Sequence, residues 1–309
     1  MIEFFQHLVN GLSLGTIYAL IALGYTMVYG VLKLINFAHG DVYMVGAFAG
    51  YYVAGSLGVR RDPTFVKAAL VVLGAMMVCG LLGFLIERLA YRPLRNRPRL
   101  TALITAIGVS FLLEYGFQLA PIRGLPIEFP PGPTPRYFPE LIARADWSIG
   151  GVSLSNYDVY GLAAAVALMI GLQLIVYRTK FGTAMRAVSF DPQVAGLMGI
   201  PVNRIISGTF VLGSVLAAAA AILNAVPRPQ IQPLFGLLPG LKAFVAAVLG
   251  GIGSVPGAMA GGLVLGLAEE YVAGYTASSY RDAIAFTVLI LVLIVRPEGL
   301  FGKARVEKV

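Results

Sequence analysis

The feature that most constrains this chain is a series of apolar, almost uncharged runs. Several reach the roughly 20 residues that a helix needs to cross a bilayer. They are Leu8–Leu32, Val42–Val59, Ala68–Ile86, Leu100–Ala120, Val159–Tyr177, Ile205–Val226, Ala243–Ala268 and Thr276–Val295. Only 12% of the 309 residues are charged, about half of the usual share in soluble domains. The chain is therefore predicted to be an all-α integral membrane protein, a polytopic helical bundle of about 8–9 transmembrane spans with short or broken helices.

Basic residues predict the orientation of these spans. They gather in segments 87–99 and 177–186 and after residue 295, and short loops rich in Lys and Arg stay cytoplasmic. Residues 121–158 then form a loop outside the membrane, in which WSIGGVSLS predicts a small hairpin, and residues 178–204 form a cytoplasmic loop. Because the run Ala243–Ala268 is broken by GGIGSVPG, we expect eight spans if it is re-entrant. If both halves cross, we expect nine and an external N-terminus.

Residues 1–309 are assigned to a single transmembrane domain. The start, MIEFFQHLVNG, lacks the basic segment of a signal peptide, so the first span is expected to be retained. The net charge of +8 lies in loops beside spans, which indicates membrane orientation and not nucleic-acid binding.

Several kinds of chemistry are excluded by what the sequence lacks. One cysteine, Cys79, and two histidines, His7 and His39, are too few for an intramolecular disulfide or a His/Cys metal cluster. The motifs HExxH and GxSxG and a Walker A loop are absent, so neither hydrolase nor ATPase chemistry is indicated. No enzyme activity, metal or cofactor is expected of this chain.

The segment INFAHGDVYM, residues 35–44, joins the first two runs. It is either a cytoplasmic turn, in which Gly40 ends one helix and Asp41 caps the next, or a broken helix that lines a substrate path. In the second case Asn36 and His39 lie at the inner end of the path. These two residues are candidate translocation residues.

Glu114 is an acid inside an apolar run. Ionisable groups at membrane depth are costly and usually face the bundle interior, so Glu114 is either a path-lining residue or an interfacial carboxylate near the end of its span. Proton-coupled or sodium-coupled carriers need several such groups. The others here are assigned to helix ends: Glu269, Glu270, Arg281 and Asp282.

Glycines recur at the spacing that lets transmembrane helices approach closely. Gly46 and Gly50 form one such pair, and Gly253, Gly257 and Gly261 continue another. We interpret both as contacts between helices of the bundle.

The stretch SFDPQVAGLMGIP, residues 189–201, predicts a short isolated helix. Ser189 or Asp191 can cap it, and Pro201 prevents its continuation. The residues assigned to it are Asp191, Pro192, Val194, Ala195, Leu197, Met198 and Gly199. Val194, Leu197 and Met198 share one apolar face, and a helix this short needs a partner for that face. The partner is either the lipid headgroups or a cytosolic protein.

This stretch is similar to the coupling loop of ABC-importer permeases, with Ala195 and Gly199 at the matching positions and without the initial Glu of the classical loop. The whole chain resembles the LivH-type permease subunits of branched-chain amino acid ABC importers. The matching residues are VNGLSLGTIYALIALGYTMVYGVLKLINFAHGDVYMVGAF (9–48), ERLAYRPLR (87–95), KAFVAAVLGGIGSVPGAMAGGLVLGLAEEY (242–271) and YRDAIAFTVLILVLIVRPEGLFG (280–302). At Glu114 the family more often has Gln.

The resemblance implies a multi-pass permease in the inner membrane of a bacterial cell. Its expected partners are a second, LivM-like permease, two cytoplasmic ABC ATPase subunits, a periplasmic binding protein and the lipid bilayer. Alternating access would be driven through the short helix. Urea or short amides are an alternative substrate class, and a stand-alone secondary carrier and a scaffold without transport are alternative functions.

Overall fold

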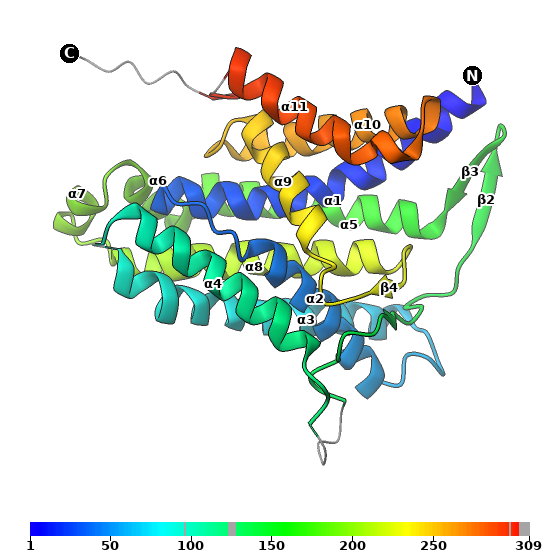
Figure 1. The fold of residues 1–309 in the computed structure, drawn as a ribbon, viewed down its shortest axis with the longest axis horizontal. Coiled ribbons are helices and arrows are strands. Elements are labelled where there is room, and N and C mark those ends of the chain that lie inside the picture. The colour runs from blue at the N-terminus through cyan, green and yellow to red at the C-terminus, as the bar shows by residue number, and fades with distance from the viewer. Residues whose placement is uncertain (96, 123–127, 297, 303–309) are drawn as a thin grey trace.

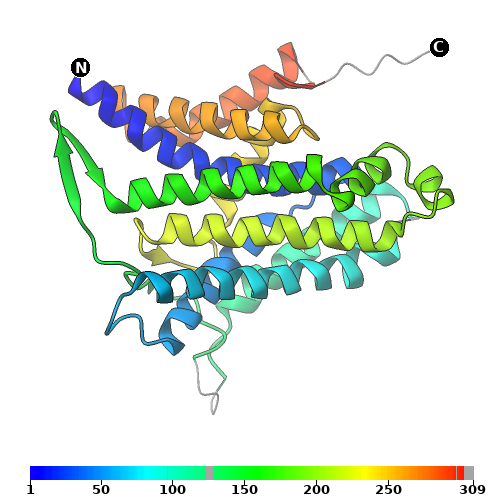
Figure 2. The same ribbon diagram turned by 180° about the vertical axis from the view of Figure 1, so that it is seen from behind.

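Long helices run side by side between the two ends of the molecule (Figures 1 and 2). The structure is a computed structural model that describes residues 1–95, 97–122, 128–296 and 298–302. Its helices are α1 (Ile2–Leu32), α2 (His39–Ser56), α3 (Phe65–Leu85), α4 (Arg99–Gln118), α5 (Asn156–Arg178), α6 (Lys180–Phe190), α7 (Pro192–Leu197), α8 (Val202–Ala225), α9 (Leu237–Gly250), α10 (Val255–Tyr275) and α11 (Arg281–Val295). A π-helical turn (Ile86–Tyr91) and a 3-10 turn (Arg92–Leu94) extend α3, and another 3-10 turn (Ser278–Tyr280) precedes α11.

Four short strands lie at one end of the bundle. They are β1 (Arg136–Tyr137), β2 (Asp146–Ile149), β3 (Val152–Ser155) and β4 (Gln230–Ile231). β1 pairs with β4, and β2 pairs with β3 in antiparallel register, Asp146 opposite Ser155. Gly150 and Gly151 turn between β2 and β3 with φ of +60° and +88°, a conformation that glycine adopts without strain. The hairpin predicted from WSIGGVSLS is confirmed.

The two ends are distinguished by what they carry. We name the end that bears the β2–β3 hairpin the outer end and the end that bears α6 and α7 the inner end, after the orientation that the sequence predicts (Figure 1). α1 starts at the outer end, where the Gln6 amide donates to the carbonyl of Ser153 at 3.1 Å and accepts from its N–H at 2.8 Å. After α11 the chain reaches the inner turn between α9 and α10, where the N–H of Leu300 donates to the carbonyl of Leu249 at 2.8 Å.

The interrupted run Ala243–Ala268 forms two separate helices, α9 and α10, joined by residues 251–254 at the inner end. The run thus contains two helices, as the nine-span alternative expects, but α9 has only 14 residues, and neither α9 nor α10 is among the helices that are long and apolar enough to span a membrane by themselves. Six helices among the described residues are long and apolar enough to span a membrane by themselves. They are α1, α4, α5, α8, and α3 and α11 with their adjoining turns. α2, α9 and α10 complete the bundle between them (Figure 1).

α1 lies in the middle of the bundle, and every residue from Leu14 to Val28 is buried. Its contact with α10 is made by backbone. A Cβ atom on Gly262 would lie 2.4 Å from the Ala19 nitrogen, and one on Gly266 would lie 2.3 Å from the Gly15 Cα. Lipid supplies no hydrophobic drive between helices, so this close van der Waals approach holds α1 and α10 together.

The other glycine pairs also lie in helix contacts. A Cβ on Gly46 would lie 2.7 Å from the Ala218 Cα, which places α2 directly on α8. A Cβ on Gly261 would lie 2.1 Å from the Ala246 carbonyl oxygen, which places α10 on α9. The interpretation as bundle contacts is confirmed for Gly46, Gly50, Gly257 and Gly261. It is wrong for Gly253, which lies in the turn before α10 with φ of +98° and has no atom of the described residues within 4 Å of its Cβ position.

The break between α1 and α2 differs from the predicted turn with two caps. α1 ends at Leu32, followed by Lys33 in the left-handed region with φ of 56°, and α2 begins at His39. Gly40 and Asp41 lie inside the first turn of α2, so Gly40 does not end a helix and Asp41 is not a cap. Glycine is needed at position 40 because a Cβ atom there would lie 2.8 Å from the Gly236 carbonyl oxygen.

α2 therefore begins part of the way along α1, within the bundle (Figure 1). The ring of His39 lies 4.7 Å from that of Tyr25 on α1. This arrangement corresponds to the broken-helix alternative for residues 35–44.

A buried ion network ties three helices together near the outer end. The ammonium of Lys242 on α9 lies 2.8 Å from a Glu269 oxygen on α10 and 2.6 Å from an Asp282 oxygen on α11. The hydroxyl of Tyr18 on α1 donates to the other Glu269 oxygen at 2.8 Å. Each charge that the bundle encloses here has a partner, as burial requires.

We predict that Gly262→Ala destabilises the bundle. The new Cβ would overlap the backbone of Ala19, and overpacking of this kind costs about 1–3 kcal/mol. Thermal unfolding of the detergent-purified protein should occur at a lower temperature. Gly171→Ala is the matched control, because a Cβ there meets nothing within 4 Å. An unchanged melting temperature for Gly262→Ala would show that α1 and α10 are not held by this contact.

Candidate functional site

The short helix predicted within residues 189–201 is present as α7, Pro192–Leu197. Asp191, and not Ser189, caps it: its Oδ1 accepts from the N–H groups of Gln193 at 2.8 Å and Val194 at 3.0 Å. Pro192 occupies the first helical position, where its missing N–H costs nothing. Gly199 follows the helix with φ of +82°, the left-handed conformation that commonly ends a helix.

The apolar face of α7 is exposed at the inner end, at the far left of Figure 1 and the far right of Figure 2. Val194, Leu197 and Met198 are 54%, 87% and 79% exposed, and Phe190 at the end of α6 is 94% exposed. Ala195 is buried on the opposite side. These four exposed residues, which we name the inner knob, form the kind of apolar patch that marks an interaction surface.

α6 was not predicted, and it determines how α7 is held. Thr179 caps it by accepting from the Gly182 N–H at 3.1 Å, and Met185 and Val188 bury its apolar side. A Cβ on Gly182 would lie 2.2 Å from the Val176 carbonyl oxygen, so α6 packs directly on the end of α5. The spacing of Met185 and Val188 was the available signal for this helix.

A second set of contacts fixes the start of α8, which follows α7. Glu87, fully buried in the π-helical turn, accepts from Arg92 at 2.8 Å and from Ser207 on α8 at 2.6 Å. Arg95 also pairs with Glu87, and it donates to Asn203 at the start of α8 at 2.6 Å. The chain leaving α7 is thus fixed to α3 within its first two turns.

The three candidate path residues are all buried but do not form one site. The Oδ1 of Asn36 accepts from the Tyr91 hydroxyl at 2.9 Å. His39 packs against Gly24, and among the described residues its Nε2 has no hydrogen-bond partner. Neither residue lines the cavity that contains Glu114.

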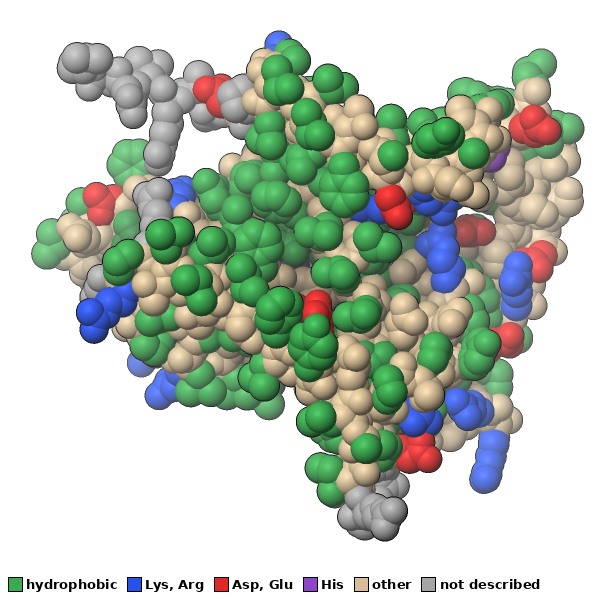
Figure 3. All heavy atoms as spheres, in the orientation of Figure 1, with side chains coloured by type: hydrophobic (Ala, Val, Ile, Leu, Met, Phe, Trp, Pro, Cys, Tyr) green, Lys and Arg blue, Asp and Glu red, His purple; other side chains and the backbone are tan. Residues whose placement is uncertain are grey.

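Glu114 lines a cavity of about 120 Å³ between α1, α2, α4 and α9. The residue is 6% exposed, and Asp41 of α2 lines the same cavity and accepts from the Ser110 hydroxyl. Figure 3 shows an acidic side chain in the middle of the otherwise hydrophobic face on which α4 and α9 lie. Asp41 was missed as a member of this cluster because its position suggested a cap.

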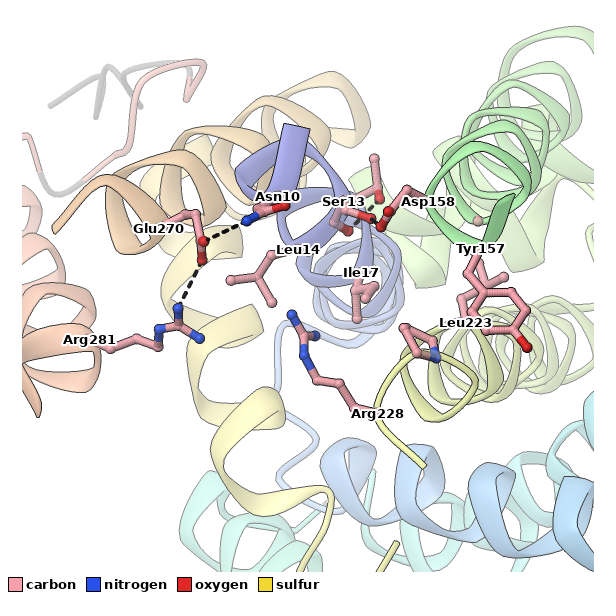
Figure 4. Close-up of a pocket in the computed structure, with 13 residues that line it drawn as sticks. Asn10, Ser13, Leu14, Ile17, Tyr157, Asp158, Leu223, Arg228, Glu270 and Arg281 are labelled. Atoms are coloured by element: carbon pink, nitrogen blue, oxygen red, sulfur yellow. Dashed lines mark hydrogen bonds and ion pairs between the residues drawn. The ribbon is translucent and has the colours of Figure 1, made fainter. Parts of the chain in front are cut away.

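A larger cavity of about 250 Å³ lies near the outer end (Figure 4). Its walls come from α1, α5, α8, α10, α11 and the segment after α8. Arg281 donates to Glu270 at 2.9 Å, and the Asn10 amide donates to the other Glu270 oxygen at 3.2 Å. Glu270 and Arg281 were predicted only as groups at helix ends, and Arg228, which also lines the cavity, was not singled out.

Comparisons with known proteins identify the family. The family model described as branched-chain amino acid transport system / permease component matches residues 7–293. The high-affinity branched-chain amino acid transport system permease protein BraD of Pseudomonas aeruginosa is 43% identical over 99% of this chain and 98% of its own length. The corresponding LivH of Escherichia coli K12 is 40% identical over 99% and 98%. The probable branched-chain amino acid transport permease protein LivH of Methanocaldococcus jannaschii is 29% identical over 92% and 88%.

These matches confirm the resemblance seen in the sequence. They also agree with the expectation that the chain is a permease component and not an enzyme. The chain therefore belongs to the permease-component family of branched-chain amino acid transport systems, and it is a multi-pass protein of the cell membrane.

Proposed function

We propose that this chain is the permease subunit of an ATP-driven importer that carries branched-chain amino acids inward. The observation that carries the proposal is the inner knob, an exposed apolar surface on a capped helix held between α6 and α8. BraD and LivH, which match 99% of this chain, are named as permeases of branched-chain amino acid transport systems. This supports the same substrate class here.

The inner knob fits a cytosolic protein partner better than lipid headgroups. A helix lying on headgroups carries Lys and Arg around its apolar side, whereas the sequence of α7 contains neither. We assign the knob to docking on the ATPase subunits, two per transporter. Residues 178–204 are then the coupling loop within a single transmembrane domain of residues 1–309.

The mechanism follows from the attachments of α7. ATP binding closes the ATPase pair and displaces α7. α6 transmits the displacement to α5 through the Gly182 contact. The hydrogen bonds of Glu87 with Arg92 and Ser207 transmit it to α3 and α8. The path is in this way switched between a form open to the outside and a form open to the inside. Substrate shifts their balance only through contacts that differ between the two states.

The remaining partners are assigned to the other surfaces. A second, LivM-like permease lies beside this chain in the bilayer, and a periplasmic binding protein delivers substrate at the outer end, where residues 121–158 form a loop with the β2–β3 hairpin. Asn36, His39 and Glu114 stay proposed path residues. Glu114 has the strongest support, because it and Asp41 place polar groups in a cavity at membrane depth.

We predict that Leu197→Glu uncouples ATP hydrolysis from transport. A carboxylate buried in a docking surface without a partner costs about 2 kcal/mol or more, so leucine uptake should fall more than about tenfold. Uptake and ATP hydrolysis are measured in proteoliposomes that contain all subunits, and membrane insertion is checked by fractionation.

Gln193→Glu is the matched control for this variant. It adds the same charge to the first turn of α7, outside the apolar face and near the helix N-terminus, where an acid is favourable. Uptake by Gln193→Glu should stay normal. Normal uptake by Leu197→Glu would mean that the inner knob is not the coupling surface.

Glu114 is predicted to act through its polarity and not through its charge. Glu114→Gln keeps hydrogen-bonding groups in the cavity and should retain leucine uptake within about twofold, whereas Glu114→Leu should reduce it about tenfold by removing them. Both variants are assayed as above. Equal uptake by Glu114→Leu and the unmodified transporter would remove Glu114 from the path.

A further inference from the structure

The outer cavity contains charges of both signs, and they differ in how they are satisfied. Glu270 and Arg281 form an ion pair with each other. Arg228 and Asp158 line the same cavity, but neither makes an ion pair within the part of the chain that the structure describes. One cation and one anion are therefore available to a ligand.

The hydrogen bonds of these two residues leave capacity for a ligand. Arg228 donates to the Asn224 Oδ1 at 2.8 Å, which uses one of its five N–H groups. Asp158 accepts from the Ser13 hydroxyl at 3.2 Å and from the Ser155 N–H at 3.1 Å. Each of its oxygens has a second lone pair.

Apolar side chains lie beside the charges. In Figure 4, Arg228 points toward Leu14 and Ile17 of α1, while Leu223 of α8 lies next to Tyr157. A cavity that offers a guanidinium, a carboxylate and an aliphatic wall matches the three parts of an aliphatic α-amino acid. Neither a simple anion nor a sugar would use all three.

We propose that this cavity binds the substrate amino acid as a zwitterion on the outer side of the permease. Arg228 binds the α-carboxylate, because guanidinium groups bind carboxylates with two parallel hydrogen bonds. Asp158 accepts from the α-ammonium, and Leu14, Ile17 and Leu223 contact the aliphatic side chain. The site receives substrate between its release from the binding protein and its entry into the membrane path. This assignment rests on the proposed function.

Labelling of a single engineered cysteine tests the site. Gly161 lines the cavity, and a Cβ there meets nothing within 4 Å, so Gly161→Cys should fold normally. The native Cys79 is buried. The complete transporter is placed in nanodiscs without the binding protein. The rate at which a membrane-impermeant thiosulfonate labels this chain is then measured by mass spectrometry.

Leucine at about ten times its dissociation constant should slow labelling about tenfold, whereas leucinamide, which lacks the carboxylate, and isocaproate, which lacks the ammonium, should slow it less than about twofold. Arg228→Gln or Asp158→Asn in the Gly161→Cys background should remove the protection by leucine. Arg144→Gln is the matched control: Arg144 is an exposed cation of the outer loop, and its variant should keep the protection. Leu223→Cys serves as a second reporter in the same cavity.

Two results would overturn the proposal. One is labelling that leucine does not slow at either reporter, and the other is protection that persists in both Arg228→Gln and Asp158→Asn. Protection by isocaproate equal to that by leucine would remove Asp158 from the site. Leucine uptake by the unmodified complex is measured in parallel. Normal uptake without protection contradicts only this site, whereas absence of ATP-driven uptake contradicts the proposed function itself.

Discussion

The direct backbone contact of α1 with α10 is the constraint on which the rest of the structure depends. Helices in lipid gain nothing from hiding apolar side chains from lipid tails, so close packing must hold them together. Gly262 and Gly266 allow α10 to reach the backbone of α1, and α1 is buried from Leu14 to Val28. Because α1 lies at the centre, the middle of the bundle is surrounded by protein. α2 can therefore begin there without exposing its first N–H groups to lipid.

The helices are joined in different ways at the two ends of the bundle. At the inner end, α5, α6, α7 and α8 follow one another with almost no intervening chain, so α7 is connected through α6 to α5 and directly to α8. At the outer end, the pairs Lys242–Glu269 and Arg281–Glu270 join α9, α10 and α11. The cavity lined by Glu270 and Arg281 lies near the outer end, and the cavity of Glu114 lies between α1, α2, α4 and α9. This arrangement suits the proposed function, in which substrate enters at the outer end and the ATPase subunits act on α7 at the inner end.

Sequence reasoning predicted the features that local chemistry determines. The spans followed from uncharged runs, and α7 followed from Asp191, Pro192 and Gly199, whose effects are confined to neighbouring residues. It failed where distant residues decide. Gly40 looked like a helix end but is required by Gly236, which lies far along the chain. The shared cavity of Asp41 and Glu114 had no signal in the sequence, since α2 and α4 meet only in the fold.

Site-specific photocrosslinking from α7 tests the central claim most directly. A photoreactive phenylalanine analogue is placed at Leu197 of the assembled transporter in native membranes, and the crosslinked partner is identified by mass spectrometry. If α7 receives work from a separate ATPase, the main product joins this chain to the ATPase subunit, and adding nucleotide changes its yield. Crosslinks to lipid alone, with or without nucleotide, would contradict the account, because the inner knob would then lie on the membrane surface.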